Sequence, residues 1–330
     1  MSERERSGLN RRQAAAILGG MALWPSAHAA EPAFPVRAIR LILPFSAGSS
    51  TDFISRLVSD QLAKQLHQPV VVENRPGAAG IIGTQQLARA TPDGYTIGLI
   101  SLASVAMAPP TLKDLPYDSV RDFAPLSALV STDMFLVAGP RAQGKDLAEF
   151  VTWARAQDKP LFLGTLGAGT SGHFAGFMFG QAAKIKFEPI HYRTFSDLMP
   201  AMLSGGIDVM LLAPSQILPF VKEGKMRALA MNGPARVPAF INVPTFLEAG
   251  YPTMQFVNWI GLAAPAKTPP EVLDVLAAEI IKATHVPGVR TKLEEGGFRV
   301  IASTRDELAA TIRKDVPVWK NMVKTSGFTV

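Results

Sequence analysis

The chain has 330 residues, with 33 Lys and Arg against 27 Asp and Glu, 48% hydrophobic residues and no Cys. These figures exclude collagen-like, coiled-coil, disulfide-stapled and disordered classes, and at roughly 150 residues per domain they indicate a globular protein of about two domains. The formal charge of +6 is not gathered in clusters of Lys and Arg, so nucleic acid is not an expected partner.

Residues 1–29 have the pattern of an export signal. Four arginines precede an apolar run over 14–24, and Ala27-His28-Ala29 is a small-x-small cleavage site. The run is too short for the roughly 20 residues that span a bilayer. We therefore expect a cleaved signal, which uses either the twin-arginine route indicated by Arg11-Arg12 or the general secretory route. Without Cys for a lipid anchor, the mature protein is expected free in the periplasm.

Next, short apolar runs alternate with helical spacing along the chain. The first half predicts strands over 39–43, 70–72 and 95–100, with helices over 53–66 and 81–90. After residue 133 the alternation restarts, with strands over 134–138, 161–163, 188–191, 207–212 and 227–231 and helices over 146–157, 174–183, 195–203 and 215–223. The tail from 270 is predicted to be mainly helical, and Thr304 and Glu307 have the spacing of a capping box.

This alternation predicts an α/β protein with two lobes, each built on a mainly parallel sheet. Residues 30–132 and 257–330 are assigned to lobe 1 and residues 133–256 to lobe 2, because the tail has too little strand to stand alone. The chain then crosses between the lobes near 130–134 and near 255–261. We expect these crossing strands to form a hinge.

Many separated motifs occur in the order and at the approximate spacing of one known family. They are Pro44 to Asp52, Gln68 to Gly80, Pro92 to Thr96, Leu115 to Asp118, Asp122-Phe123, Gly169 to His173, Gly205 to Asp208, Gly224 to Ala230, Val243 to Thr245 and Trp259 to Leu262. In these motifs the chain resembles the Bug family, the extracytoplasmic solute receptors of tripartite tricarboxylate transporters. Ser49 and Thr194 stand where that family usually has Gly, which leaves the identity of the ligand open.

The resemblance implies the two-lobed Venus flytrap fold of a periplasmic binding protein. It also implies a small organic carboxylate as ligand and the membrane subunits of such a transporter as partners. A monomer is expected. A periplasmic ligand sensor or signalling partner of the same fold, acting on a sensor kinase, is the alternative that the sequence does not separate from a transport receptor.

One glycine turn joins the strand over 39–43 to the helix that follows it. The first N–H groups of a helix are unpaired and lie at the positive end of its dipole, so such a turn can receive a carboxylate. The resemblance places one ligand carboxylate here. The candidate contacts are Phe45, Ala47, Gly48, Ser49, Ser50 and Asp52, with Asp52 either capping the helix or meeting an amino group of a ligand. An ordinary turn with Thr51 or Asp52 as N-cap is the alternative.

A second glycine turn contains a G-x-G-x-x-G pattern at Gly167, Gly169 and Gly172. This pattern also occurs in dinucleotide sites, but no clear ribose-binding acid follows apart from Glu188 at a loose spacing. As a carboxylate cradle it offers backbone N–H groups and two hydroxyls, and the resemblance implies a ligand contact here. The candidates are Gly167, Thr170, Ser171 and His173, the last of which either meets the ligand or is satisfied by local backbone.

Four further candidates come from strand ends, and each has a structural alternative. Ser101 and Ser104 follow the strand over 95–100 and either reach the ligand or cap their loop. Tyr192, beside Arg193, ends another strand on the side where open sheets bind ligands, and this pair either meets the ligand or has a surface role. Asp208 either contacts the ligand or holds a hinge loop.

Catalysis has little support in the sequence. There is no G-x-S-x-G elbow and no H-E-x-x-H motif, and the histidines are far apart in sequence. We therefore expect no enzyme activity, no cofactor and no metal. A nucleotide-dependent oxidoreductase is the remaining rival from the enzyme class.

Overall fold

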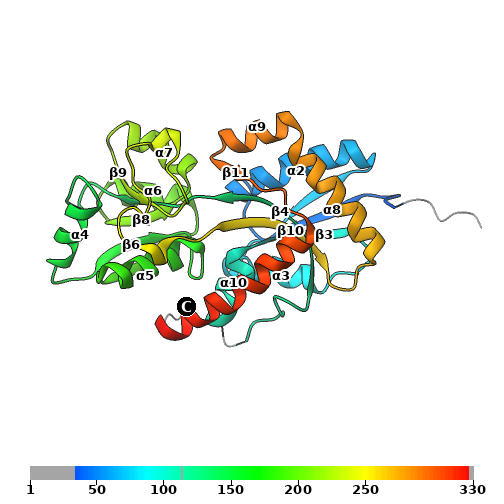
Figure 1. The fold of residues 1–330 in the computed structure, drawn as a ribbon, viewed down its shortest axis with the longest axis horizontal. Helices are drawn as coiled ribbons and strands as arrows, with labels where there is room; N and C mark the ends of the chain where they lie inside the picture. The colour runs from blue at the N-terminus through cyan, green and yellow to red at the C-terminus, as the bar shows by residue number, and fades with distance from the viewer. Residues whose placement is uncertain (1–33, 113, 327–330) are drawn as a thin grey trace, which may run out of the picture. The chain divides into compact units, whose positions relative to one another are not determined.

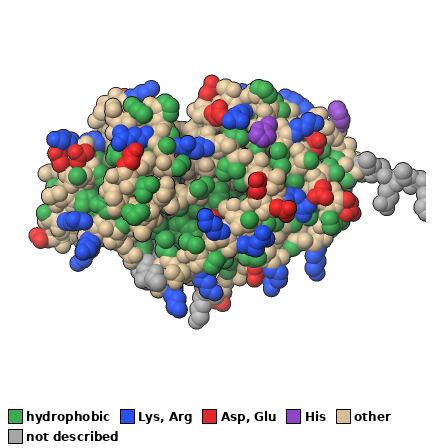
Figure 2. Space-filling view, in the orientation of Figure 1, with side chains coloured by type: hydrophobic (Ala, Val, Ile, Leu, Met, Phe, Trp, Pro, Cys, Tyr) green, Lys and Arg blue, Asp and Glu red, His purple; other side chains and the backbone are tan. Residues whose placement is uncertain are grey.

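The computed structural model describes residues 34–112 and 114–326, and the described residues from 37 onward form one compact unit (Figure 1). The expected export signal lies outside the described residues. Within the described ranges, no helix has both the length and the apolar character needed to cross a membrane. Figure 2 shows basic and acidic side chains interspersed over the visible face.

The first sheet has six strands in the order β11-β4-β10-β3-β1-β2. Its strands are β1 (Ile39–Leu43), β2 (Val70–Asn74), β3 (Thr96–Ser101), β4 (Phe123–Thr132), β10 (Asn258–Pro265) and β11 (Phe298–Val300). Strand β1 lies parallel to β2 and β3, whereas β10 pairs antiparallel with β3 and β4, and β11 antiparallel with β4. The glycine turn after β1 therefore lies at the carboxyl edge of a parallel trio.

The second sheet has five strands in the order β7-β6-β8-β5-β9. Its strands are β5 (Phe135–Ala138), β6 (Leu161–Thr165), β7 (Phe187–His191), β8 (Val209–Leu212) and β9 (Arg227–Met231). Strand β6 lies parallel to β7 and β8, while β5 pairs antiparallel with β8 and β9. The second glycine turn follows β6 and so lies at the carboxyl edge of a second parallel trio.

Helices cover both sheets (Figure 1). They are α2 (Ser50–Leu66), α3 (Ile81–Ala88), α4 (Leu147–Arg155), α5 (Ser171–Ala183), α6 (Phe195–Leu203), α7 (Pro214–Lys222), α8 (Pro270–His285), α9 (Pro287–Glu295) and α10 (Arg305–Ser326). A short π-helical turn, η2 (Ala103–Met107), follows β3. The capping box predicted before α10 is confirmed, because Thr304 N–H donates to Glu307 Oε2 and Glu307 N–H donates to Thr304 Oγ1.

Alternate side chains of the second sheet pack on opposite helical layers. On one face, Leu136 and Leu211 belong to an apolar cluster with residues of α4 and α5. On the other face, Phe135 and Met210 belong to a cluster with residues of α6 and α7. Strands β5 and β8 of this sheet are buried on both faces, as expected where helices cover both sides of a sheet, whereas the edge strand β7 is partly exposed.

The sheets differ from the prediction of mainly parallel sheets, because each is mixed and its parallel pairing is confined to three strands. Strand β4 was expected only as a crossing near 130–134, yet it runs for ten residues, and β11 was not expected at all. Strand β4 is buried almost throughout, so its sequence lacks the alternation that identifies a half-exposed strand. The strands of the first sheet come from 39–132 and 258–300 and those of the second from 135–231, the order on which the two-lobe division rests.

Candidate ligand-binding turns

The first glycine turn is closed by its own side chains. Gly48 has a φ of +75°, a conformation that glycine adopts without steric cost. Its N–H donates to Asp52 Oδ2 at 3.0 Å, and Asp52 N–H donates to the hydroxyl of Ser49, the N-cap of α2, at 3.2 Å. The locally capped turn that the sequence analysis set beside a ligand site is therefore present, but its N-cap is Ser49 and not Thr51 or Asp52, and Asp52 instead accepts the Gly48 N–H.

Asp52 is a buried carboxylate with several donors. Arg56 Nε donates to Asp52 Oδ2 at 3.0 Å, and Asn74 Nδ2 donates to Oδ1 at 2.9 Å. Burial desolvates this carboxylate and opposes ionisation, but the hydrogen bonds from Arg56, Asn74 and Gly48 together hold its pKa below the ordinary value. Asp52 is thus ionised at neutral pH, and it places a negative charge inside the turn.

Two N–H groups of this turn are left for a ligand. The N–H groups of Ser50 and Thr51 have no acceptor among the described residues, as expected for the first turn of a helix. Ala47 is exposed, while Phe45 is half-buried, with its ring against Gly80 and its carbonyl accepting from Asn74 Nδ2. The structure thus brings together the candidates of the first turn.

The second glycine turn repeats the arrangement with a different acceptor. Gly169 also has a φ of +75°, and its N–H donates to His173 Nδ1 at 3.2 Å. The N–H groups of Ser171 and Gly172, at the start of α5, have no acceptor among the described residues. The two hydroxyl protons expected for a ligand are donated within the chain, from Thr170 Oγ1 to the Gly167 carbonyl and from Ser171 Oγ to Asn258 Oδ1.

His173 is satisfied by local backbone, the alternative that the sequence analysis set beside a ligand contact. It is 5% exposed, and its ring lies edge-on to that of His191, with centroids 4.8 Å apart. Burial, together with the neighbouring His191, lowers the pKa of His173 to about 4. His191 Nδ1 lies 2.6 Å from Thr165 Oγ1, and burial lowers the pKa of His191 as well. The second turn is therefore neutral at pH 7.

The remaining candidates have structural partners. Ser101 and Ser104 are buried and bond to one another and to each other's backbone, so they cap the loop after β3. Tyr192 is half-buried against the cluster of α6 and α7 and follows β7 at the same sheet edge as the second turn. Its N–H donates to the Thr165 carbonyl at 2.9 Å.

Asp208 does not lie with the other candidates. It precedes β8, at the amino edge of that strand, whereas both glycine turns follow the carboxyl ends of strands. The residue is fully buried, and Arg141 donates from Nε and Nη2 to its two oxygens, both at 2.8 Å. The N–H of Phe162 donates to the same carboxylate at 2.8 Å. All of these contacts fit a structural role in which Asp208 holds its loop. We therefore leave Asp208 out of the proposed site.

The two positions that depart from the Bug pattern are both helix N-caps. Ser49 caps α2, and the Thr194 hydroxyl accepts from Asp197 N–H at 3.2 Å to cap α6. Hydroxyl side chains are favoured at N-caps because they satisfy an unpaired N–H. These substitutions therefore have a local structural explanation.

Polar side chains form hydrogen bonds with both chain segments that connect the two sheets, near Met134 and near Phe256. Asn232, after β9, accepts from Met134 N–H through Oδ1 at 2.7 Å and donates from Nδ2 to the Phe256 carbonyl at 3.1 Å. Beside it, Arg299 of β11 donates to Asp133 Oδ2 at 2.8 and 3.0 Å. These contacts lie where the hinge was predicted.

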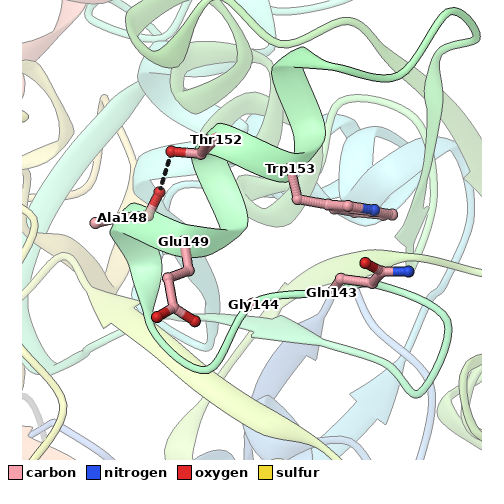
Figure 3. A pocket seen from close by; sticks show the side chains of 6 residues that line it. All are labelled: Gln143, Gly144, Ala148, Glu149, Thr152 and Trp153. Carbon is pink, nitrogen blue, oxygen red and sulfur yellow. Dashed lines mark hydrogen bonds between the residues drawn. The ribbon is translucent and has the colours of Figure 1, made fainter.

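Two hollows lie along α4, and none of the predicted site residues lines them. One, of about 430 Å³, is bordered by Gln143, Gly144 and residues of α4, with Trp153 and Gln143 close to one another (Figure 3). The other, of about 480 Å³, lies between α4 and the segment carrying Pro244 and Tyr251. In the part of the chain that the structure describes, no three His, Cys, Asp or Glu side chains are grouped as metal ligands.

Several residues that contact the two turns were not predicted as site residues. They are Arg56, Asn74, Thr165, His191 and Asn258, which the fold brings to the turns. One signal was available: an acceptor side chain stands four residues after a turn glycine in both Gly48 to Asp52 and Gly169 to His173. The contact between Thr165 and His191 could not be predicted without the register of β6 and β7, which places the two residues side by side.

Comparison with known proteins identifies the family. A family model described as tripartite tricarboxylate transporter family receptor matches residues 54–328. A UPF0065 protein of Bordetella bronchiseptica is 32% identical over 89% of this chain and 87% of its own length, and BugT of Bordetella pertussis is 28% identical over 89% and 90%.

Solved structures agree with this family in fold. The periplasmic binding protein BugD superposes with a TM-score of 0.81 at 29% identity, covering 89% of this chain and 99% of BugD. MatC from Rhodopseudomonas palustris, solved with bound malate, has a TM-score of 0.80 at 29% identity, covering 88% of this chain and all of MatC. The expected two-lobed binding-protein fold is thereby confirmed. The family is one of receptors rather than enzymes, and this chain belongs to the tripartite tricarboxylate transporter receptor family, the Bug proteins.

Proposed function

We propose that this protein is a periplasmic receptor that binds a small organic acid with more than one polar end and delivers it to the membrane subunits of a tripartite tricarboxylate transporter. Family membership and the malate bound to MatC support the ligand class. The proposed site consists of the turn from Phe45 to Asp52 and the turn from Gly167 to His173, with Tyr192 beside the second. Residues 133–256 form the lobe that carries the second turn.

The observation that carries this proposal is the set of unpaired N–H groups at the two helix starts. Ser50 and Thr51 offer theirs at α2, and Ser171 and Gly172 offer theirs at α5. Hydrogen bonds to a charged acceptor contribute roughly 1.5–3 kcal/mol each, and the helix dipoles add to them. Because Asp52 already occupies the Gly48 N–H, we assign the ligand carboxylate to the neutral second turn and the other polar end to the first.

Thermal unfolding of the mature protein with malate, adipate and succinate tests the function, with the corresponding diamides as uncharged controls. A ligand at about 100 times its Kd should stabilise the fold by about 2.7 kcal/mol, which raises Tm by a few degrees. Small-angle scattering should then show a smaller radius of gyration with the bound acid, since the proposed lobes close by hinge motion. A carboxylate panel without any shift would contradict the ligand class.

The export route is part of the same proposal. We infer that residues 1–29 are removed on export, so N-terminal sequencing of the protein from a periplasmic fraction should begin near Ala30. Recovery of the chain with Met1 in a membrane pellet would contradict this assignment.

A further inference from the structure

His191 is the last residue of β7, the edge strand of the second sheet. In the register of β6 and β7 it stands beside Thr165, and its Nδ1 lies 2.6 Å from Thr165 Oγ1. Both residues end parallel strands, at the sheet edge where open α/β folds bind ligands. The Thr165 hydroxyl holds one ring nitrogen and so fixes the orientation of the imidazole.

The same imidazole is adjacent to the first turn of α5. His173, whose ring lies 4.8 Å from that of His191, is the third residue of this helix. The unpaired N–H groups of Ser171 and Gly172 immediately precede His173 in the chain. His191 is therefore the exposed member of a histidine pair whose buried member shapes the second glycine turn.

The second ring nitrogen of His191 is available. Its Nε2 has no hydrogen-bond partner among the described residues. The groups that face the ring are Thr165 from β6 and His173 from α5, and the charged residues nearest on its own segment, Glu188 and Arg193, make no hydrogen bond to it there. An anion that reaches Nε2 does not have to displace a hydrogen-bond partner among the described residues.

We propose that His191 is a specificity-determining residue that binds a ligand carboxylate through Nε2, next to the N–H groups of α5, and takes up one proton from solvent when it does so. This inference rests on the proposed function, since it names a contact of the same site. The protonated imidazole donates to the carboxylate, whereas an isosteric amide gains no such charge pairing.

The sign of the pH dependence follows from the two states. In the free protein, partial desolvation of the His191 ring by its neighbours lowers its pKa, so the ring is neutral at pH 7. A carboxylate beside Nε2 raises that pKa, so the bound state holds more protons than the free state. Affinity should increase as the pH falls toward 6, and the gain should be lost as the pH rises above the pKa of the bound form. His173 stays neutral over this range because its pKa is about 4.

Isothermal titration with malate, adipate and succinate tests the proposal in two buffers of different ionisation enthalpy. For the wild type we expect a Kd about fivefold lower near pH 6 than near pH 8, within the tenfold per pH unit that one proton allows, and net proton uptake on binding. His191→Gln retains a hydrogen-bonding partner for Thr165 but cannot titrate. It should lose the pH dependence and the proton uptake. His285→Gln, at an exposed position at the end of α8, is the matched control and should behave as wild type.

A second measurement covers the case in which His191→Gln does not fold. The imidazole proton resonances of wild-type His191, followed by NMR with malate at saturation, should titrate at a higher pH than without it. Binding with unchanged pH dependence in His191→Gln, or an unshifted titration, would overturn this assignment alone. Failure of the wild type to bind every acid of the panel would overturn the proposed function together with it.

Discussion

Gly48 and Gly169 occupy equivalent places in the two halves of the molecule. Each follows a parallel strand, each has a φ of +75°, and each donates its N–H to a side chain four residues later. In the first turn the acceptor is the ionised carboxylate of Asp52, and in the second it is the neutral imidazole of His173. The two turns therefore have the same backbone geometry, but the glycine N–H is accepted by a charged side chain in the first and by a neutral one in the second.

This difference teaches that two similar turns need not receive the same ligand group. The carboxylate of Asp52 offsets the positive end of the α2 dipole, and Arg56 compensates it from the outside. At α5 no carboxylate among the described residues accepts from the turn, so the helix start keeps its attraction for a negative ligand group. The expectation from the sequence treated both turns as carboxylate cradles, and the structure supports assigning them different roles.

The largest expected effect on stability comes from removing the Asp52 carboxylate, which closes the first turn. Asp52→Ala deprives Gly48, Asn74 and Arg56 of an acceptor in three half-buried hydrogen bonds. We expect the free energy of unfolding to fall by about 3 kcal/mol, as measured by urea denaturation. Asp60→Ala, at an exposed position of the same helix, should change it by less than about 0.5 kcal/mol. Equal losses in the two variants would contradict the closing role of Asp52.

The neutral His173 imidazole that accepts the Gly169 N–H should make the free energy of unfolding depend on pH. The pKa of His173 in the folded protein is about 4, against 6.5 for a free imidazole, so the unfolded state binds more protons between these values. Its contribution to stability is present above about pH 6.5 and is lost as the pH falls toward 4. Between about pH 7 and pH 5 the wild type should lose about 2 kcal/mol more than His173→Gln. Asp52, with its lowered pKa, should contribute nothing to that slope. Parallel pH profiles for wild type and His173→Gln would show that the imidazole is not buried neutral.

A third experiment asks whether the first turn still meets the ligand. A Cβ at Gly48 would meet nothing within 4 Å, and Asp and Asn tolerate its positive φ better than other residues. Gly48→Asp adds a second negative charge to the turn, whereas Gly48→Asn adds the same shape without charge. We expect the charged variant to bind the identified acid at least about tenfold more weakly than the neutral one, or about 1.4 kcal/mol, in isothermal titration. Identical affinities would remove the first turn from the site.

The smallest effect separates the helix caps of the two turns. The Ser49 hydroxyl accepts Asp52 N–H, whereas Thr170 makes no side-chain cap and donates instead to the Gly167 carbonyl. Ser49→Ala should cost about 1 kcal/mol of stability by thermal or urea unfolding. Thr170→Ala should cost about half as much, because it loses one neutral hydrogen bond. A larger loss for Thr170→Ala would mean that the second turn depends on its hydroxyl more than on His173.

Much of the fold was predictable because its elements have strong local signals. The predicted bounds of β1, β9 and α6 agree with the structure, since each is a distinct apolar or periodic segment between turn residues. Strand β4 was not recognised at its full length, because burial on both faces removes the alternation on which recognition depends.

The candidate site was predicted in part for similar reasons. The glycine turns have a signal in the sequence, since a positive φ favours glycine. The acceptors of their N–H groups were not predicted, because they depend on packing: Asn74 reaches Asp52 from 22 residues away, and His191 reaches Thr165 from 26. Such partners are fixed by strand register and packing, which a single sequence does not specify.

Asn232 has a consequence for how the molecule moves. One carboxamide bonds to both peptide segments that connect the two sheets, at Met134 and at Phe256. Two separate connections would each twist about their own backbone angles, but a shared amide makes the twist of one depend on the twist of the other. In the proposed hinge motion the two connections would therefore twist together, which would limit the lobes to one direction of rotation and keep the spacing of the glycine turns reproducible.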